Sequence, residues 1–292
     1  MIAVALVTFN RKELLVRTLE SVMSQTLKVD KIFILNNAST DGTEDYLRER
    51  GYLDHPQILY KRAIENEGGA GGFHEAMKAA YEAGAEWIWT MDDDIIVDPE
   101  ALETMLCYKS MSLCIHPSKQ FENGKRFIWE GYFDSTSGRS IWVEDGFLKN
   151  KEYSFVNYAC FEGMLVHRSI IEKIGFPDKR FFICYDDLIF GWLASFYTNI
   201  IYLNKTLITR TIPEAQKKNP KAISNYYVIR NMFLIYEYLK KRSPRFYPWT
   251  TRLFFIAKAI KVLFEQPCWF QTKLFFYAIR DGFKGKFYKF ES

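Results

Sequence analysis

The sequence lacks the long apolar run that a membrane-spanning helix needs. The apolar run at its start ends after seven residues, and residues 244–290 contain no stretch that stays apolar for about twenty residues. Residues 1–7 also lack a basic leader and a cleavage site, so we expect them to form a buried strand rather than a signal peptide.

Paired cysteines and metal-spaced histidines are absent as well. The five cysteines are scattered, form no Cys-x-x-Cys pair and are odd in number, which predicts reduced thiols in a cytosolic protein. None of the four histidines has a partner at metal-ligand spacing. The sequence contains no Gly-x-Ser-x-Gly elbow, no Walker-type lysine loop and no His-Glu-x-x-His motif, so hydrolase, P-loop and zinc-protease functions lack support.

Charge is distributed unevenly along the chain. Residues 240–292 hold 12 Lys and Arg against three Asp and Glu, whereas the first 239 residues hold 27 against 32. The mildly acidic first part argues against nucleic-acid binding. The length and this contrast predict a catalytic α/β domain over residues 1–240 and a basic helical extension over residues 241–292.

Strands and helices are predicted to alternate in the first hundred residues. Apolar runs typical of strands occur at residues 2–8, 31–35, 58–60 and 87–91. Amphipathic segments between them predict helices, and the alternation predicts a Rossmann-like, mainly parallel sheet flanked by helices. Ligands of such sheets bind at the carboxyl ends of the strands, where the polar loops at 8–11, 36–43 and 91–94 fall.

Beyond Pro99 the pattern is weaker. We expect strands near 127–133 and 163–167, and helices at 169–174, 186–196 and 222–241.

Three consecutive carboxylates, Asp92, Asp93 and Asp94, follow the fourth predicted strand. They repel one another unless a cation neutralises them. In extended backbone Asp92 and Asp94 project to one side and Asp93 to the other. Asp92 and Asp94 therefore suit Mg²⁺ or Mn²⁺ that bridges a diphosphate. Two alternatives are a solvated strand end that caps the next helix, and a phosphatase-type nucleophile. The second normally needs a Thr or Ser soon afterwards, and residues 95–97 are Ile, Ile and Val.

Two further segments are candidates for chemistry. The glycines of residues 68–72 precede a helix, where backbone amides favour anions or sugar hydroxyls, although the segment can also be a plain flexible turn. Asp186 and Asp187 open a predicted helix after an aromatic stretch. Asp187 is a candidate general base, with a simple helix cap as the alternative.

Taken together, the motifs at residues 7–11, 36–43, 66–73, 91–94 and 185–187 resemble, in order and spacing, those of family 2 glycosyltransferases with the GT-A fold. The resemblance covers about residues 2–235. Within the family, residues 66–73, the triple Asp and residues 226–231 (Tyr-Tyr-Val-Ile-Arg-Asn) most resemble bacterial galactofuranosyltransferases, with rhamnosyltransferases as nearest neighbours.

The resemblance implies an inverting, metal-dependent hexosyltransferase. It would transfer galactofuranose from UDP-galactofuranose to a hydroxyl of a polyprenyl-linked glycan acceptor, in the synthesis of a cell-surface polysaccharide such as O-antigen or capsule. A rhamnosyltransferase that uses dTDP-rhamnose is the alternative. A sugar nucleotidyltransferase is more distant, because it normally has a glycine-rich loop after the first strand, and residues 8–11 contain no glycine.

Site residues follow from the matched motifs. Asp187 would be the catalytic base, and Asp92 and Asp94 would hold Mn²⁺ or Mg²⁺. The residues expected to contact the donor are Thr8, Asn10, Arg11, Asn36, Asn66, Gly69, Gly71, Gly72, Asp92 and Asp93.

The sequence departs from the family pattern at three places. Asn36 stands where many relatives have Asp, and Ile189 where they often have a carboxylate. Relatives also supply a metal-binding His about two dozen residues after the base, but this chain has no His beyond His167, and residues 209–211 are Thr, Arg and Thr. The metal site is therefore expected to be one protein ligand short, so either water completes it or the metal dependence is weaker.

Basic and aromatic residues alternate through residues 244–290. Amphipathic helices of this composition suit an anionic membrane surface, which predicts a cytoplasmic protein attached peripherally to the inner face of the cell membrane. The alternative is that the aromatic residues pack on the catalytic domain or on a second subunit of a homo-oligomer.

Overall fold

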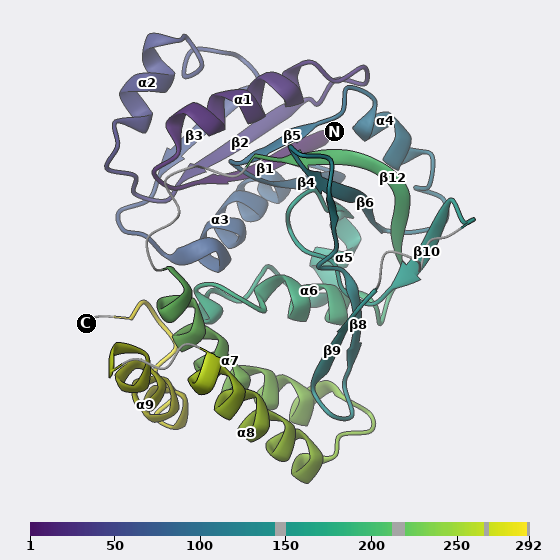
Figure 1. The fold of residues 1–292 in the computed structure, drawn as a ribbon. Coiled ribbons are helices and arrows are strands. Elements are labelled where there is room, and N and C mark those ends of the chain that lie inside the picture. Colours follow the sequence, from purple (N-terminus) through teal and green to yellow (C-terminus); the bar gives the residue numbers. More distant parts are fainter. Residues whose placement is uncertain (144–149, 212–219, 266–268, 291–292) are drawn as a thin grey trace.

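The computed structural model describes residues 1–143, 150–211, 220–265 and 269–290 (Figure 1). Its first half is the predicted alternation of strands and helices. The strands are β1 (Ile2–Thr8), β2 (Lys31–Asn36), β3 (Ile58–Arg62) and β4 (Trp87–Asp92), which pair in parallel in the order β3-β2-β1-β4. This part of the sequence-based prediction is confirmed.

Strand β1 lies between two helical layers, and its alternating residues face opposite sides. Ala3, Ala5 and Val7 pack with α3 (Gly68–Glu82), whereas Val4 and Leu6 pack with α1 (Lys12–Met23). Because successive side chains of a strand point to opposite faces, a strand covered on both faces must be apolar throughout. The helix α2 (Thr43–Glu49) follows β2.

The second half of the sheet contains two strands that the periodicity did not predict. They are β6 (Cys114–Phe121) and the eleven-residue β12 (Ile200–Arg210), which pair in parallel. Between β4 and β6 lies β11 (Leu165–His167), antiparallel to both, so the full order is β10-β12-β6-β11-β4-β1-β2-β3. Strands β1–β4, β6 and β12 therefore point in one direction, in agreement with the expected mainly parallel sheet with flanking helices.

Shorter elements complete this part of the chain. They are β5 (Ile95–Val97), α4 (Ala101–Leu106), β7 (Arg126–Phe127), β8 (Gly131–Asp134), β9 (Arg139–Trp142), β10 (Tyr153–Val156), α5 (Arg168–Ile174), the 3₁₀ helix η1 (Lys179–Phe181) and α6 (Asp186–Ala194). The single strand predicted near 127–133 was wrong, because β7 pairs with β6 whereas β8 forms a separate hairpin with β9.

Three helices end the chain: α7 (Pro220–Arg242), α8 (Pro248–Glu265) and α9 (Trp269–Phe283). They lie below the sheet, beyond α6, in Figure 1. Tyr226 and Tyr227 of α7 pack with Leu274 and Ala278 of α9, while Leu234 of the same helix packs in the cluster that includes residues of α6. Helix α7 thus joins the two parts, and the division at residues 240 and 241 stays a prediction. None of the helices in the described part of the chain is long and apolar enough to cross a membrane.

The glycine-rich segment is helical rather than a loop, because α3 begins at Gly68. Gly68 has a φ of +73°, and a Cβ there would lie 2.1 Å from the carbonyl oxygen of Phe182. A Cβ on Gly72 would lie 2.5 Å from Val7, whereas a Cβ on Gly69 would meet nothing within 4 Å. Glycine at position 68 therefore lets the start of α3 touch the turn before α6, where the amide of Ala70 donates to the Phe182 carbonyl at 3.0 Å.

Replacing Gly68 with Ala should destabilise the fold by about 2–4 kcal/mol, because it combines left-handed backbone strain with a clash against backbone. Gly69→Ala is the matched control. It lies one residue further along the helix in open space and should leave stability unchanged or raise it by about 0.5–1 kcal/mol. Urea unfolding monitored by circular dichroism compares the two, and equal stabilities would contradict the close approach.

Candidate active site

Asp93 anchors the loop that follows β1. One of its carboxylate oxygens accepts hydrogen bonds from the Thr8 hydroxyl at 2.7 Å and the Phe9 amide at 3.1 Å, and the other accepts from Arg11 at 3.0 Å. The parallel register that sets Val7 beside Asp92 brings these residues together. Asp93 was expected to project away from Asp92 and Asp94, but Asp93 and Asp94 contact the same nitrogen of Arg11, at 3.0 and 2.9 Å. Strand β4 ends at Asp92, so the expected alternation does not continue through residues 93 and 94. Both oxygens of Asp93 already have protein partners. Its role as a donor contact stays a prediction.

Asp92 and Asp94 share their side of the strand end with a third carboxylate, Glu162. One oxygen of each of the three lies within 4.8 Å of the others. The Oδ1 atom of Asp94 is buried without a hydrogen-bond partner. Burial raises the pKa of Asp92 well above its usual range, and the charges of Asp94 and Glu162 raise it further. Three converging carboxylates with an unsatisfied oxygen fit a hard divalent cation such as Mg²⁺ or Mn²⁺.

Glu162 was not predicted from the sequence. It lies in the segment before β11, among apolar residues such as Phe161, Met164 and Leu165, and only 1% of its surface is exposed. A single carboxylate in an apolar run could have indicated a functional residue, since a buried charge needs a partner. Glu162 is thus a candidate for the third protein ligand that the sequence was expected to lack, and the expected shortage of one ligand stays a prediction.

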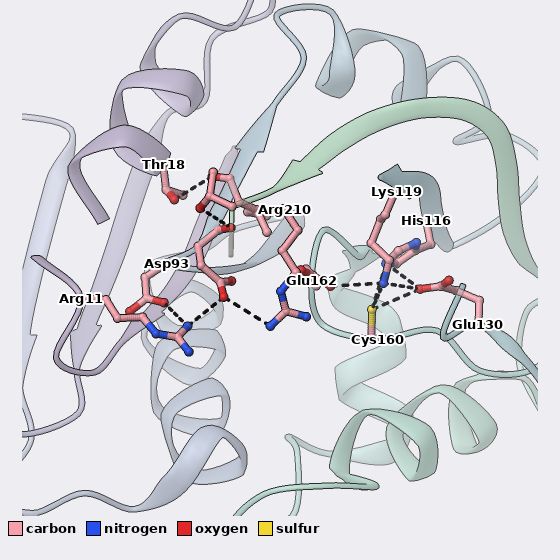
Figure 2. A network of polar contacts seen from close by, with 12 residues as sticks. Arg11, Thr18, Asp93, His116, Lys119, Glu130, Cys160, Glu162 and Arg210 are labelled. Carbon is pink, nitrogen blue, oxygen red and sulfur yellow. Dashed lines mark hydrogen bonds and ion pairs between the residues drawn. The ribbon is translucent and has the colours of Figure 1, made fainter. Parts of the chain in front are cut away.

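Two arginines neutralise the carboxylates in the structure. Arg11 lies 2.9 Å from Asp94, and Arg210, at the end of β12, lies 3.3 Å from Asp94 and 3.5 Å from Glu162. Figure 2 shows both guanidinium groups turned toward this cluster. Arg210 stands in the stretch where the family pattern places its histidine, so a cationic side chain contacts the cluster where a metal ligand was expected.

The loops at the ends of β1 and β2 are joined by hydrogen bonds. The side-chain oxygen of Asn10 (Oδ1) accepts from the Thr40 amide at 2.7 Å. Asn36 is fully buried, donates to the Tyr60 hydroxyl and accepts from the Ser39 amide. Its side-chain groups are therefore both engaged within the protein, and its predicted contact with the donor is untested.

Asn37 was not among the predicted site residues. Its side chain joins the end of β2 to the start of α3. The side-chain nitrogen of Asn37 donates to the side-chain oxygen of Asn66 at 3.0 Å and to the Gly68 carbonyl at 2.8 Å. Its side-chain oxygen accepts from the backbone amide of Glu67. Asn66 in turn accepts from the Gly68 amide. The roles predicted for Asn66 and for Gly69, Gly71 and Gly72 in donor binding remain predictions, and these contacts place Asn66 and the first residue of α3 beside the loop after β2.

A strained turn places Asp186 and Asp187 at the start of α6. Phe182, Cys184 and Tyr185 all have positive φ values, between 63° and 71°. Non-glycine residues adopt this conformation only where the surroundings impose it. Tyr185 is the N-cap residue of α6, so the turn ends where the helix and its two carboxylates begin.

Two buried side chains of α7, Arg230 and Asn231, hold this turn in place. The Asn231 amide donates to the carbonyl oxygens of Phe181, Ile183 and Cys184, at 3.0, 2.8 and 2.9 Å. Arg230 donates to the carbonyls of residues 180, 181 and 288. The Arg-Asn pair at the end of the motif at 226–231 therefore positions the turn, and it connects that turn to the C-terminal helices.

The environment of Asp187 suits a proton acceptor. Burial raises its pKa, while a hydrogen bond from the Leu188 amide at 2.7 Å and the positive charge of Lys119 oppose the shift. Burial also raises the pKa of the neighbouring Asp186, and the charge of Asp187 adds to that shift. A carboxylate whose pKa is raised in this way accepts a proton more readily than an exposed aspartate does.

The sequence model described as glycosyl transferase family 2 matches residues 3–175. The chain belongs to this family. It is 28% identical over 199 residues to the galactofuranosyltransferase GlfT1 of Mycolicibacterium smegmatis, covering 64% of this chain and 63% of the relative. It is 30% identical over 190 residues to the GlfT1 of Mycobacterium tuberculosis strain H37Rv, covering 62% of this chain and 60% of the relative. The chain thus spans about three-fifths of the length of these curated relatives.

Solved structures support the fold. Staphylococcus aureus TarS, residues 1–349 in complex with UDP-GlcNAc, aligns with a TM-score of 0.62 at 16% identity, over 97% of this chain and 80% of that one. A second TarS structure also aligns with a TM-score of 0.62, over 48% of its length. At this identity the likeness extends to the architecture alone. The predicted family and its GT-A architecture are thereby confirmed.

Replacing Glu162 with Gln should weaken Mn²⁺ binding at least about tenfold, because the amide keeps the shape of the side chain but removes a charged ligand. Calorimetric titration of the metal into the purified protein measures the change. Glu122→Gln, at an exposed carboxylate that pairs with Arg17, is the control and should leave the affinity unchanged. Equal affinities of the Glu162 variant and the unaltered protein would remove Glu162 from the ligand set.

Proposed function

We propose that the protein is an inverting glycosyltransferase that transfers galactofuranose from UDP-galactofuranose to a hydroxyl of a glycan acceptor. The observation that carries this proposal is the convergence of Asp92, Asp94 and Glu162 at the carboxyl end of β4. The donor sugar is suggested by the printed names of the mycobacterial relatives.

Asp187 serves as the base in the proposed reaction. It accepts the proton of the acceptor hydroxyl as that oxygen attacks the anomeric carbon from the side opposite the diphosphate. Its pKa, raised by burial, makes it a better proton acceptor than an exposed aspartate. Because the base must be deprotonated, transfer should decline as the pH falls through this raised pKa, in a range above that of ordinary aspartates.

In the proposed complex, the diphosphate of the donor lies against the acidic cluster. Asp92, Asp94 and Glu162 would hold Mn²⁺ or Mg²⁺, which when bound offsets the charge that develops on the leaving diphosphate. Arg11 and Arg210 contribute positive charge at the same place and share the neutralisation of the carboxylates. Asp93 keeps Arg11 and the loop after β1 in position.

The test of this proposal is Asp187→Asn, assayed for transfer of galactofuranose and for donor binding. The substitution should lower the transfer rate by about 10²–10⁴-fold, because the amide cannot accept the proton. Donor binding should persist, measured as protection against thermal unfolding by UDP-galactofuranose with Mn²⁺.

Asp54→Asn, at an exposed position away from the site, is the matched control and should keep full activity. An active Asp187→Asn variant would refute the role of the base. Stronger protection of the unaltered protein by dTDP-rhamnose than by UDP-galactofuranose would instead support the rhamnosyltransferase alternative.

The C-terminal extension is proposed to attach the protein to the inner, cytoplasmic face of the cell membrane, where a polyprenyl-linked acceptor would be presented. Helix α8 presents an exposed apolar stripe that repeats at helical spacing. It is formed by Trp249, Leu253, Ile256, Ile260 and Phe264, which are 47–75% exposed. Exposed basic residues, Arg252 and Lys261, flank it. A stripe of this kind suits insertion into an anionic lipid surface.

Placing glutamate at both Leu253 and Ile260 should weaken binding to phosphatidylcholine vesicles that contain phosphatidylserine by about tenfold or more, since burying one such side chain contributes roughly 1.5–3 kcal/mol. Vesicle co-sedimentation measures the bound fraction. Ile141→Glu, at an equally exposed position on β9, is the control that should bind normally. Undiminished binding of the double variant would show that α8 does not contact the membrane, and the stripe would then be a surface for another subunit.

A further inference from the structure

A second polar cluster lies beside the carboxylates and supplies no group that reacts in the proposed transfer. Lys119 on β6 is fully buried together with His116, Glu130 and Cys160. Its Nζ atom lies 2.6 Å from the Cys160 sulfur, 2.8 Å from Glu130 and 3.3 Å from Glu162. Figure 2 shows the lysine amine at the centre of this group.

The arrangement does not favour a metal ion. His116, Glu130 and Cys160 offer ligand atoms within 4.8 Å of one another. However, the Lys119 amine contacts both the sulfur and Glu130, and no oxygen of Glu130 is left buried without a partner as Oδ1 of Asp94 is. The aromatic rings of Phe127 and Trp129 lie 5.0 Å from the amine and leave it directed toward the sulfur and the carboxylates.

The separation between nitrogen and sulfur is unusually short. Hydrogen bonds from N–H to oxygen span about 2.9–3.0 Å, and sulfur is a larger atom than oxygen. At 2.6 Å the Lys119 nitrogen and the Cys160 sulfur are closer than such a hydrogen bond permits, at a distance suited to two atoms that share one bridging atom. Strand β6 and the segment before β11 hold the two side chains in this position.

We propose that Lys119 and Cys160 form an oxidative crosslink in which one oxygen atom bridges the lysine nitrogen and the cysteine sulfur. A small neutral peroxide supplies the oxygen and accepts the electrons. The first hydrogen peroxide molecule converts the Cys160 thiol to a sulfenic acid and leaves as one water. The second takes two electrons from the amine as the sulfenic oxygen bonds to nitrogen, and two waters leave. One hydrogen remains on the nitrogen.

The crosslink has a consequence for the acidic cluster. The bridged nitrogen no longer carries the positive charge of an ammonium group, so Glu130 would lose the cation that faces it and Glu162 would keep Arg210. Its formation does not depend on the proposed transfer reaction, because it needs only the two side chains and a peroxide. An experiment on the crosslink therefore gives a result that does not depend on whether the proposed transfer occurs.

Peptide mass spectrometry of the folded protein after treatment with hydrogen peroxide tests the proposal. The expected product is a peptide pair joined through Lys119 and Cys160, heavier than the sum of its parts by one oxygen atom and lighter by two hydrogen atoms. Trypsin should no longer cleave after Lys119, and dithiothreitol should restore both linear peptides.

Three controls define the result. Protein unfolded in urea before the peroxide is added should give no joined peptide, because the two side chains are then separated. Lys119→Arg keeps a cation beside Glu130 and Glu162 but replaces the amine, and Cys160→Ser removes the sulfur, so neither should give the product. Recovery of Cys160 as a free thiol, or as a sulfenic or sulfinic acid without a link to Lys119, would overturn the proposal.

Discussion

Concentrated negative charge at the carboxyl end of β4 is the constraint on which the site depends. Asp92, Asp93 and Asp94 follow a buried strand, and Glu162 joins them from the next segment of the sheet. Carboxylates removed from water are costly unless cations or hydrogen bonds compensate them. Their partners come from distant parts of the chain, so the carboxylates are compensated only when the chain is folded.

Each compensating cation arrives on a different element, and each has a separate role. Arg11 from the loop after β1 pairs with Asp93 and Asp94, while Arg210 from the end of β12 bridges Asp94 and Glu162. Lys119 from β6 neutralises the other side of Glu162. Glu162 thus lies between the cluster proposed to bind the diphosphate and the buried lysine-cysteine pair, so a change at one alters the charge that surrounds the other.

The C-terminal helices contribute to the site through backbone strain rather than charge. The turn before Asp186 and Asp187 contains three non-glycine residues with positive φ, and Arg230 and Asn231 of α7 satisfy its carbonyl groups. Arg230 also binds the carbonyl of Tyr288, so the chain beyond α9 participates in holding this turn. The turn that precedes Asp187 and the chain beyond α9 are therefore linked by one set of hydrogen bonds through α7.

The sequence by itself determined the first four strands and the triple Asp, because continuous apolar runs and local carboxylates leave a direct pattern. It also identified the family through the order of its motifs, and it placed Asp187 at the start of a helix. Tertiary structure alone decided the rest. Strands β6 and β12 mix apolar and polar residues, so their pairing had no clear periodicity, and Glu162 and Arg210 meet Asp94 only because those strands are neighbours in the sheet. The compensation of buried charge is a long-range property, since partners that are separated by up to 116 residues become adjacent only when the chain folds.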